Sequence, residues 1–226
     1  MASHSKASVL ETIRHDGIVP VFHDADPTTC TEVAARVVAG GLSTLEFTNR
    51  GDGAMGRFQH LLQWASMNHR GLVLGVGSIV DPGTAAHAID LGANFVFAPS
   101  FSAEVATVCN RRNIPYVPGC GTVTEVQRAY EAGCDIVKLF PAGQLGGPAF
   151  LKALRAPCPW VQAIPTGGVE PTEASLGAWY GAGAAAVGIG SKLLPSAMVT
   201  SGDWAGLESS VADAVAAVAA ARGTAD

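Results

Sequence analysis

A lysine lies in the middle of a segment that otherwise has the composition of a buried β-strand, residues 135–142 (DIVKLFPA). Ile136, Lys138 and Phe140 are spaced two apart, so their side chains would share one face of that strand. An apolar environment withdraws water from the amine and favours its neutral form, which is a nucleophile. Lys138 is therefore a candidate nucleophile, and with a carboxylate beside it the segment would be equipped for a Schiff-base reaction on a carbonyl substrate.

A count along the chain predicts a carboxylate beside this lysine. Four predicted helices end at a glycine able to take the left-handed conformation. These are Gly41, Gly92, Gly133 and Gly183, and the fifth residues after them are Glu46, Phe97, Lys138 and Gly188. In an eight-stranded α/β barrel, alternate strands contribute the four side chains of one interior layer. Glu46 and Lys138 are thus predicted to share a layer, with Phe97 as its wall and Gly188 leaving space; counting from Gly40 would reverse the facing of Glu46.

The elements that would position these residues are short strands alternating with longer helical segments, which is typical of a parallel sheet. Eight strands are predicted, at residues 18–22, 44–48, 72–78, 94–100, 114–119, 135–141, 161–168 and 185–191. Asp26 and Asp81, each followed by proline, are predicted helix N-caps. The pattern predicts a single-domain (β/α)8 TIM barrel over residues 1–226 with a short N-terminal extension. An open doubly wound sheet would usually show G-x-G-x-x-G after its first strand, and IVPVFHDADPTT has none.

The composition argues against several classes of function. The 226 residues include 48% hydrophobic residues and 27 glycines, with a net charge of −5 and no basic stripe, so we expect no nucleic-acid partner. No apolar run has membrane-spanning length and the N-terminus lacks the apolar core of a signal peptide, which predicts a cytoplasmic protein without a membrane partner. The five cysteines contain no C-x-x-C pair, so free buried thiols and no metal site are expected, Cys120 among them as a packing residue.

Polar residues follow the predicted strands at the end where barrel loops form active sites. Arg50 comes directly after the second strand, and its planar guanidinium is suited to a substrate carboxylate, although a solvated surface arginine is the alternative. Thr48 and Ser78 end their strands with hydroxyl groups that could orient a substrate or serve only in packing and capping. A buried Glu46–Lys138 ion pair without chemistry would contribute little stability, because desolvation offsets the attraction.

Two glycine-rich segments follow the last two strands, residues 165–171 (PTGGVEP) and 188–195 (GIGSKLLP). Glycine lets backbone N–H groups approach an anion closely, and the loops after strands seven and eight are the usual phosphate site of this fold. Gly167, Gly168 and Ser191 are the predicted phosphate ligands, and Lys192 is expected to be a solvated neighbour.

Taken in order, these segments resemble the class I 2-keto-3-deoxy-6-phosphogluconate (KDPG) aldolase family, which includes 4-hydroxy-2-oxoglutarate (KHG) aldolases. The resemblance covers about residues 18–195. It includes GIVPVF, AGGLSTLEFTNR, GVGSIVDP, FAPSF, YVPGCGTVTE, EAGCDIVKLFPA, PTGGVEP and GIGSKLLP. An ordered set of this kind is far more specific than any single motif.

The resemblance implies a role for each matching residue. The lysine of K-x-F-P, Lys138, would form the Schiff base, and Glu46 of E-x-T-x-R would be the acid/base. Arg50 would bind the carboxylate of the pyruvate portion, and Ser78 stands where the family's G-x-G-T motif has threonine. The remaining substrate-binding positions would be Thr48, Pro99, Phe140, Thr166, Gly167, Gly168, Gly190 and Ser191. The family needs no metal or cofactor and its members are commonly homotrimers.

The implied reaction is cleavage of KDPG to pyruvate and glyceraldehyde 3-phosphate. Within the same class, KHG or the galactose-series epimer of KDPG is an alternative substrate, because the motifs are shared. A non-catalytic phosphate-binding barrel would use Glu46 and Lys138 only structurally, and a sugar-phosphate isomerase or epimerase would need no nucleophilic amine.

Overall fold

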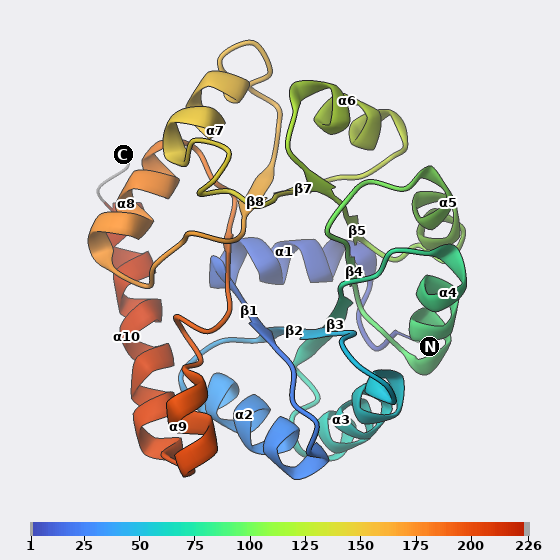
Figure 1. Cartoon of the computed structure of the whole chain (residues 1–226), viewed down its shortest axis with the longest axis vertical. Helices are drawn as coiled ribbons and strands as arrows, with labels where there is room; N and C mark the ends of the chain where they lie inside the picture. Colours follow the sequence, from blue (N-terminus) through green and yellow to red (C-terminus); the bar gives the residue numbers. More distant parts are fainter. Residues whose placement is uncertain (1, 224–226) are drawn as a thin grey trace.

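Strands occupy the centre of the structure and helices surround them (Figure 1). The computed structural model describes residues 2–223. The strands are β1 (Ile18–Phe22), β2 (Thr44–Thr48), β3 (Val73–Gly77), β4 (Val96–Phe97), β5 (Tyr116–Val117), β6 (Gly119–Cys120), β7 (Val137–Leu139), β8 (Ala163–Pro165) and β9 (Val187–Ile189). The helices are α1 (Lys6–Asp16), α2 (Pro27–Ala39), α3 (Ala54–Asn68), α4 (Pro82–Leu91), α5 (Ala103–Arg111), α6 (Val123–Glu131), α7 (Pro148–Arg155), α8 (Glu173–Gly181), α9 (Ser196–Ser201) and α10 (Trp204–Gly223).

The strands pair in parallel within two sheets, as the alternation of strand and helix predicts. One sheet has the order β5-β4-β3-β2-β1-β9 and the other the order β6-β7-β8. The predicted strand at 114–119 is divided into β5 and β6 at Pro118, which has no N–H to donate to a neighbouring strand. A bridge between Thr166 and Gly188 joins the end of β8 to β9. The α/β class with parallel strands is therefore confirmed.

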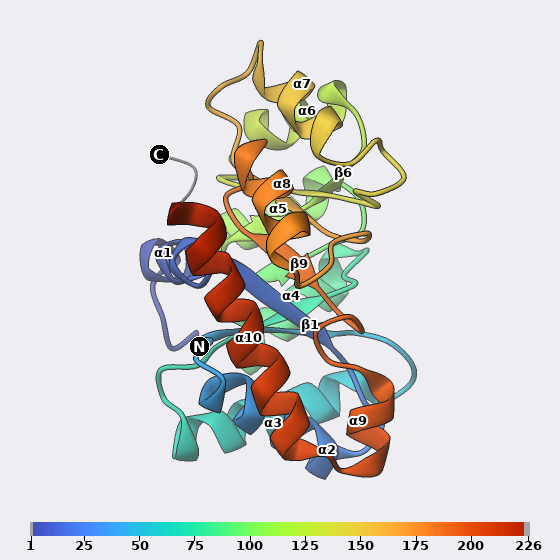
Figure 2. The same ribbon diagram turned by 90° about the vertical axis from the view of Figure 1, so that its left-hand side faces the viewer.

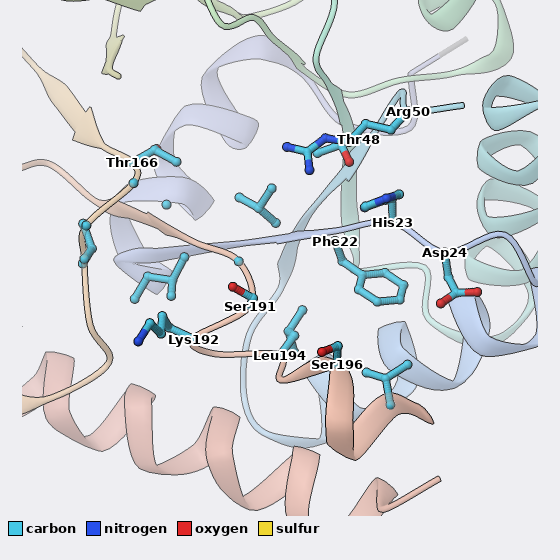
Figure 3. A pocket seen from close by; sticks show the side chains of 18 of the residues that line it. Phe22, His23, Asp24, Thr48, Arg50, Thr166, Ser191, Lys192, Leu194 and Ser196 are labelled. Carbon is cyan, nitrogen blue, oxygen red and sulfur yellow. The ribbon is translucent and has the colours of Figure 1, made fainter. Parts of the chain in front are cut away.

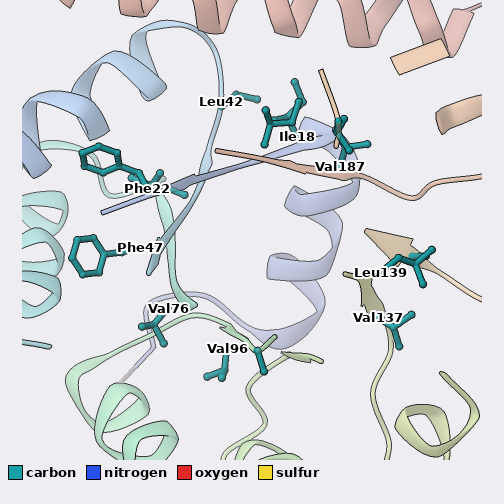
Figure 4. Close-up of a cluster of buried hydrophobic side chains, with 14 of the residues drawn as sticks. Ile18, Phe22, Leu42, Phe47, Val76, Val96, Val137, Leu139 and Val187 are labelled. Atoms are coloured by element: carbon teal, nitrogen blue, oxygen red, sulfur yellow. The ribbon is translucent and has the colours of Figure 1, made fainter. Parts of the chain in front are cut away.

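Alternate residues along each strand face opposite ways and form two apolar clusters. Val137 and Leu139 on β7 pack outward in the larger cluster, between the strands and the surrounding helices (Figure 4). Ile136 and Ile164 belong to a smaller cluster on the opposite face of the strands. Lys138 stands between Val137 and Leu139 and therefore faces the same way as Ile136.

Helix α1 gives the predicted N-terminal extension a definite structural place. Its Val9, Leu10 and Ile13 are buried in the smaller cluster together with residues of the strands. Figure 1 shows α1 crossing behind the strands, on the side from which β1 begins. Asp16, the last residue of α1, is buried and accepts hydrogen bonds from Ser43 N at 2.7 Å and Thr44 Oγ1 at 2.9 Å. The extension thus covers the amino-terminal ends of the strands.

Helix boundaries follow local signals in the sequence. Asp26 and Asp81 accept hydrogen bonds from Thr29 N and Thr84 N, each at 2.8 Å, which confirms both predicted N-caps. At the end of α2, Gly41 has a left-handed φ of 100°, whereas Gly40 has a φ of −74°. Gly41 is therefore the correct origin for the count that places Glu46.

Helix α10 closes the ring by packing against α2 and α8 (Figure 2). Arg36 of α2 forms an ion pair with Glu208 of α10 at 3.2 Å. Near the other end of α10, Arg222 donates to the carbonyl oxygen of His15 at 2.9 Å. Within residues 2–223, no helix combines the length and apolar character needed to cross a membrane.

Candidate active site

Lys138 is held by a strand that is hydrogen-bonded on both sides. It lies on β7, in register with Gly119 of β6 and Ile164 of β8, and its backbone N–H donates to the carbonyl oxygen of Pro118 at 2.8 Å. Its side chain is buried, with the residue only 6% exposed. The amine lies 5.6 Å from the ring centroid of Phe97 and 5.3 Å from that of Phe140. The environment is therefore largely aromatic.

The carboxylate predicted beside Lys138 is present. Glu46 lies on β2, in register with Val21 of β1 and Gly75 of β3, and is 1% exposed. Its Oε2 is 3.7 Å from Lys138 Nζ and makes no hydrogen bond in the described structure. The two residues come from strands far apart in sequence yet share one interior space, as the count from Gly41 and Gly133 predicts.

Glycines on neighbouring strands make room for the polar side chains. A Cβ atom at Gly77 would overlap Oε1 of Glu46. A Cβ atom at Gly188 would overlap Oγ1 of Thr166, so Gly188 leaves space as expected. Any larger residue at either position would displace a polar side chain of the candidate site.

Burial raises the pKa of the Glu46 carboxyl, because an ionised carboxylate loses hydration in this environment. The positive charges of Lys138 and Arg50 oppose that shift. Burial outweighs these two charges, so the pKa of the Glu46 carboxyl lies above its usual range, and this carboxyl is next to the amine of Lys138. Such a group can accept a proton and return it in the course of a reaction.

A cavity of about 490 Å³ opens beyond the pair, at the carboxyl ends of the strands (Figure 3). Thr48, the last residue of β2, and Phe140, which directly follows β7, line it, and each stands two residues beyond Glu46 or Lys138. The pair therefore lies one layer beneath the cavity. Thr48 is 1% exposed and its Oγ1 has no hydrogen-bond partner in the described residues.

Arg50 is exposed at the rim of this cavity, directly after β2. Figure 3 shows its guanidinium extending over the cavity beside Thr48. Its charge acts on the buried Glu46 carboxyl. A guanidinium in this place can hold an anionic group of a ligand whose reacting carbon lies near Lys138.

The predicted phosphate loops line the same cavity. Their residues there are Thr166, Gly167, Gly168, Gly190 and Ser191. Lys192 also lines the cavity, and its amine pairs with Glu170 at 3.2 Å, so this exposed lysine joins the two loops rather than standing alone. Backbone N–H groups of such loops are suited to an anion.

Two predicted site residues lie elsewhere. Ser78 follows β3 with a left-handed φ of 61°, and Pro99 is exposed beyond β4. Neither lines the cavity. A Cβ atom at Gly119 would overlap the carbonyl oxygen of Pro99, so Pro99 packs against the end of the divided strand.

His23 and Asp24 line the cavity directly after β1, although the motifs did not single them out. Burial and the charge of Arg50 lower the pKa of the His23 imidazole. The available signal was position, because every residue that directly follows a strand lies at the same end of a parallel sheet.

The remaining reactive side chains are placed for packing. Cys120 is buried in the larger apolar cluster, and burial raises the pKa of its thiol to about 12. All five cysteines are free and buried. Among residues 2–223, no group of three or more His, Cys, Asp or Glu side chains is arranged to hold a metal ion.

A parallel α/β fold with a buried lysine and carboxylate beneath a cavity with glycine-rich loops defines an aldolase of the Schiff-base type. The family model "KDPG and KHG aldolase" matches residues 9–210, and the chain belongs to this family. The predicted resemblance is thereby confirmed.

Individual relatives of known sequence or structure agree with this family assignment. The chain is 33% identical over 204 residues to a 2-dehydro-3-deoxy-phosphogluconate aldolase of Pseudomonas aeruginosa, with 90% of each chain covered. The crystal structure of the 2-keto-3-deoxy-6-phosphogluconate aldolase of Zymomonas mobilis is similar with a TM-score of 0.81 and 26% identity, over 94% of this chain and 97% of that one. The KDPG aldolase of Legionella pneumophila, solved with pyruvate as a covalent carbinolamine intermediate, shares the fold with a TM-score of 0.80 at 24% identity, over 92% and 97% of the two chains.

Proposed function

We propose that this protein is a class I aldolase that cleaves KDPG to pyruvate and glyceraldehyde 3-phosphate. One observation carries the proposal: Lys138 and Glu46, both buried, lie 3.7 Å apart beneath a cavity. The net stability of such a pair is small because desolvation offsets its attraction, so chemistry is the better reason for its presence. Membership of the family supports the same activity.

The first half of the reaction uses the amine. The neutral Nζ of Lys138 attacks the C2 ketone of the sugar acid, and loss of water from the adduct gives an iminium ion. Phe97 and Phe140 lie beside the amine and form the aromatic wall of the space in which it reacts. The iminium draws electrons from the neighbouring C3–C4 bond.

The second half uses the carboxylate. Glu46, through a water molecule, accepts the proton of the C4 hydroxyl, and the C3–C4 bond breaks. The aldehyde product leaves, and the electron pair of the broken bond remains as the enamine of pyruvate. Protonation at C3 and hydrolysis of the iminium then release pyruvate and restore the free amine.

The two ends of the cavity bind different parts of the substrate. Arg50 binds the carboxylate of the pyruvate portion through paired hydrogen bonds. The loop residues Thr166, Gly167, Gly168, Gly190 and Ser191 bind the phosphate, and Thr48 and Phe140 position the carbon chain between the two ends. Substrate contacts by Ser78 and Pro99 stay predictions, because both residues lie outside the cavity lining.

We further propose that the chain is one domain in which the two sheets close as a (β/α)8 barrel. If β5 and β6 are counted as one strand divided at Pro118, the pairings run through eight strands, and the bridge from Thr166 to Gly188 lies at the closing point. The hydrogen bond from Ala185 N to the carbonyl oxygen of Ala163, 2.9 Å long, supports closure at the same place.

On the basis of the family resemblance, we propose that the protein forms a homotrimer and that it is located in the cytoplasm. Exposed apolar side chains, such as Met67 at 76% and Val80 at 65%, offer surface that other copies can cover. The free buried cysteines fit a reducing compartment. Light scattering on the purified protein should give the mass of three chains of 23.0 kDa each.

The activity is tested by measuring pyruvate release from KDPG, from its galactose-series epimer and from KHG under identical conditions. The proposal expects the highest kcat/KM with KDPG, because the glycine-rich loops supply a phosphate site that KHG does not use. A folded protein that releases no pyruvate from any of the three would contradict the aldolase function. A clear preference for KHG would keep the chemistry and reject the substrate.

A further inference from the structure

His23 stands between the two halves of the cavity because of the strand order. In the order β2-β1-β9, the strand that ends at Phe22 separates the strand before Arg50 from the strand before Gly190. A Cβ atom at Gly190 would lie 3.4 Å from the carbonyl oxygen of Val21, so the β9 loop touches β1. The residue that follows β1 therefore adjoins both the Arg50 end and the phosphate-loop end of the cavity.

The imidazole faces this shared space. Figure 3 shows the side chain of His23 above Phe22, with Ser191 across the cavity. His23, Ser191 and Lys192 all line the cavity. The imidazole therefore shares one cavity with the residues of the glycine-rich loops.

Three charged groups act on the imidazole, and one more lines the cavity from the β9 side. Burial is the largest influence on the pKa of His23 and lowers it, as do Arg50 at the end of β2 and Arg57 on α3. Asp24, on the same loop, raises it. Lys192, paired with Glu170, faces the cavity from the β9 side. A bound phosphate dianion would oppose this lowering of the pKa and favour the protonated imidazole.

Accordingly, we propose that His23 is a specificity-determining residue that donates a hydrogen bond to the phosphate of the substrate and favours phosphorylated over unphosphorylated aldehydes. The inference rests on the proposed aldolase function and adds a side chain to a phosphate site otherwise built from glycine-rich loops. Binding of the phosphate brings a proton onto the imidazole, so the hydrogen bond becomes charge-assisted in the complex. Lys138 and Glu46 take no part in this contact, because both lie beneath the cavity and His23 lines it.

The test measures condensation of pyruvate with D-glyceraldehyde 3-phosphate and with D-glyceraldehyde, and takes the ratio of the two kcat/KM values. In His23→Gln this ratio should fall about tenfold, the effect of losing one charge-assisted hydrogen bond. In His23→Arg, which keeps a positive donor, the ratio should stay within about threefold of the wild type. His87→Gln, the same change at an exposed position on α4, is the matched control and should leave the ratio unchanged.

The pH dependence separates a phosphate contact from a merely structural role. The advantage of wild type over His23→Gln with the phosphorylated aldehyde should be largest at about pH 6 and should shrink towards about pH 8, as the imidazole loses its proton. A ratio that changes by less than about twofold in His23→Gln, or an equal loss with both aldehydes, would overturn the inference. A wild-type protein that condenses neither aldehyde would overturn the proposed function, and this inference with it.

Discussion

Each end of the strands contains a buried carboxylate, and the two carboxylates have different surroundings. At the amino-terminal end, Asp16 accepts hydrogen bonds from Ser43 N and Thr44 Oγ1, beside an α1 whose apolar residues fill the space beneath the strands. At the carboxyl-terminal end, Oε2 of Glu46 has no hydrogen bond, and its nearest cation is 3.7 Å away.

This difference in hydrogen bonding indicates that Asp16 serves the stability of the fold and that Glu46 serves its function. A buried carboxylate with its hydrogen bonds complete stabilises the fold, whereas one left incomplete costs stability. Oε2 of Glu46 can therefore still bind a substrate or a water molecule, whereas Oδ2 of Asp16 already accepts two hydrogen bonds. We expect changes at the carboxyl-terminal end to alter turnover with little effect on folding, and changes at the amino-terminal end to do the reverse.

The largest effect is expected from Lys138→Ala. Without the amine no iminium forms, so kcat for KDPG cleavage should fall on the order of 10⁴-fold or more. The circular dichroism spectrum and the unfolding midpoint should remain close to those of wild type, because Lys138 lies directly beneath the cavity rather than within the apolar core. Lys152→Ala, at an exposed position on α7, is the control. Turnover retained in Lys138→Ala would remove the amine from the mechanism.

Glu46→Gln should lower kcat by about 10²- to 10⁴-fold, the usual contribution of a general base. Burial raises the pKa of Glu46, and the base form is needed for cleavage, so wild-type kcat/KM should fall as the pH drops through that raised value. The variant should lack this acidic limb yet still form an iminium with pyruvate. A rate near that of wild type would assign the proton transfer to another group. Glu131→Gln, exposed at the end of α6, serves as the control.

Ile13→Ala tests the amino-terminal end. Ile13 is fully buried in the smaller apolar cluster, so the truncation should reduce the free energy of unfolding by about 2–5 kcal/mol, and Ile13→Val by about 0.5–1.5 kcal/mol. Urea denaturation gives both values. Activity measured well below the unfolding transition should match wild type. A fall in kcat in the still-folded variant would break the proposed division between the two ends.

The smallest effect is expected from Asp16→Ala, which leaves Ser43 N and Thr44 Oγ1 without their acceptor. The cost should be about 1–3 kcal/mol of unfolding free energy, with kcat unchanged. Asp16→Asn retains one acceptor oxygen and should lose less. If both variants were as stable as wild type, the hydrogen bonds of Asp16 would not hold the amino-terminal end.

Local patterns in the sequence were sufficient to predict the pair at the centre of the site. The strand period of two and the left-handed glycine at Gly41 fix which way Glu46 faces, and the same reasoning from Gly133 places Lys138. The caps at Asp26 and Asp81 could be predicted because each depends on a few neighbouring residues. The division of one predicted strand at Pro118 was not predicted, although proline has no N–H to donate to a neighbouring strand.

Other features depend on contacts that a linear pattern does not contain. Val9, Leu10 and Ile13 lie on one side of α1, but only the assembled strands show that this side fills the space beneath them. His23 enters the cavity because β1 lies between β2 and β9. Ser78 and Pro99 follow strands as expected, yet neither lines the cavity, and Pro99 instead packs against Gly119.

Borohydride reduction in the presence of pyruvate, followed by peptide mass spectrometry, tests the central claim most directly. The chain has four lysines, Lys6, Lys138, Lys152 and Lys192, so the modified position can be assigned without ambiguity. The account predicts a reduced pyruvyl adduct on Lys138 alone. Folded protein that gains no adduct, or gains it on another lysine, would contradict the account.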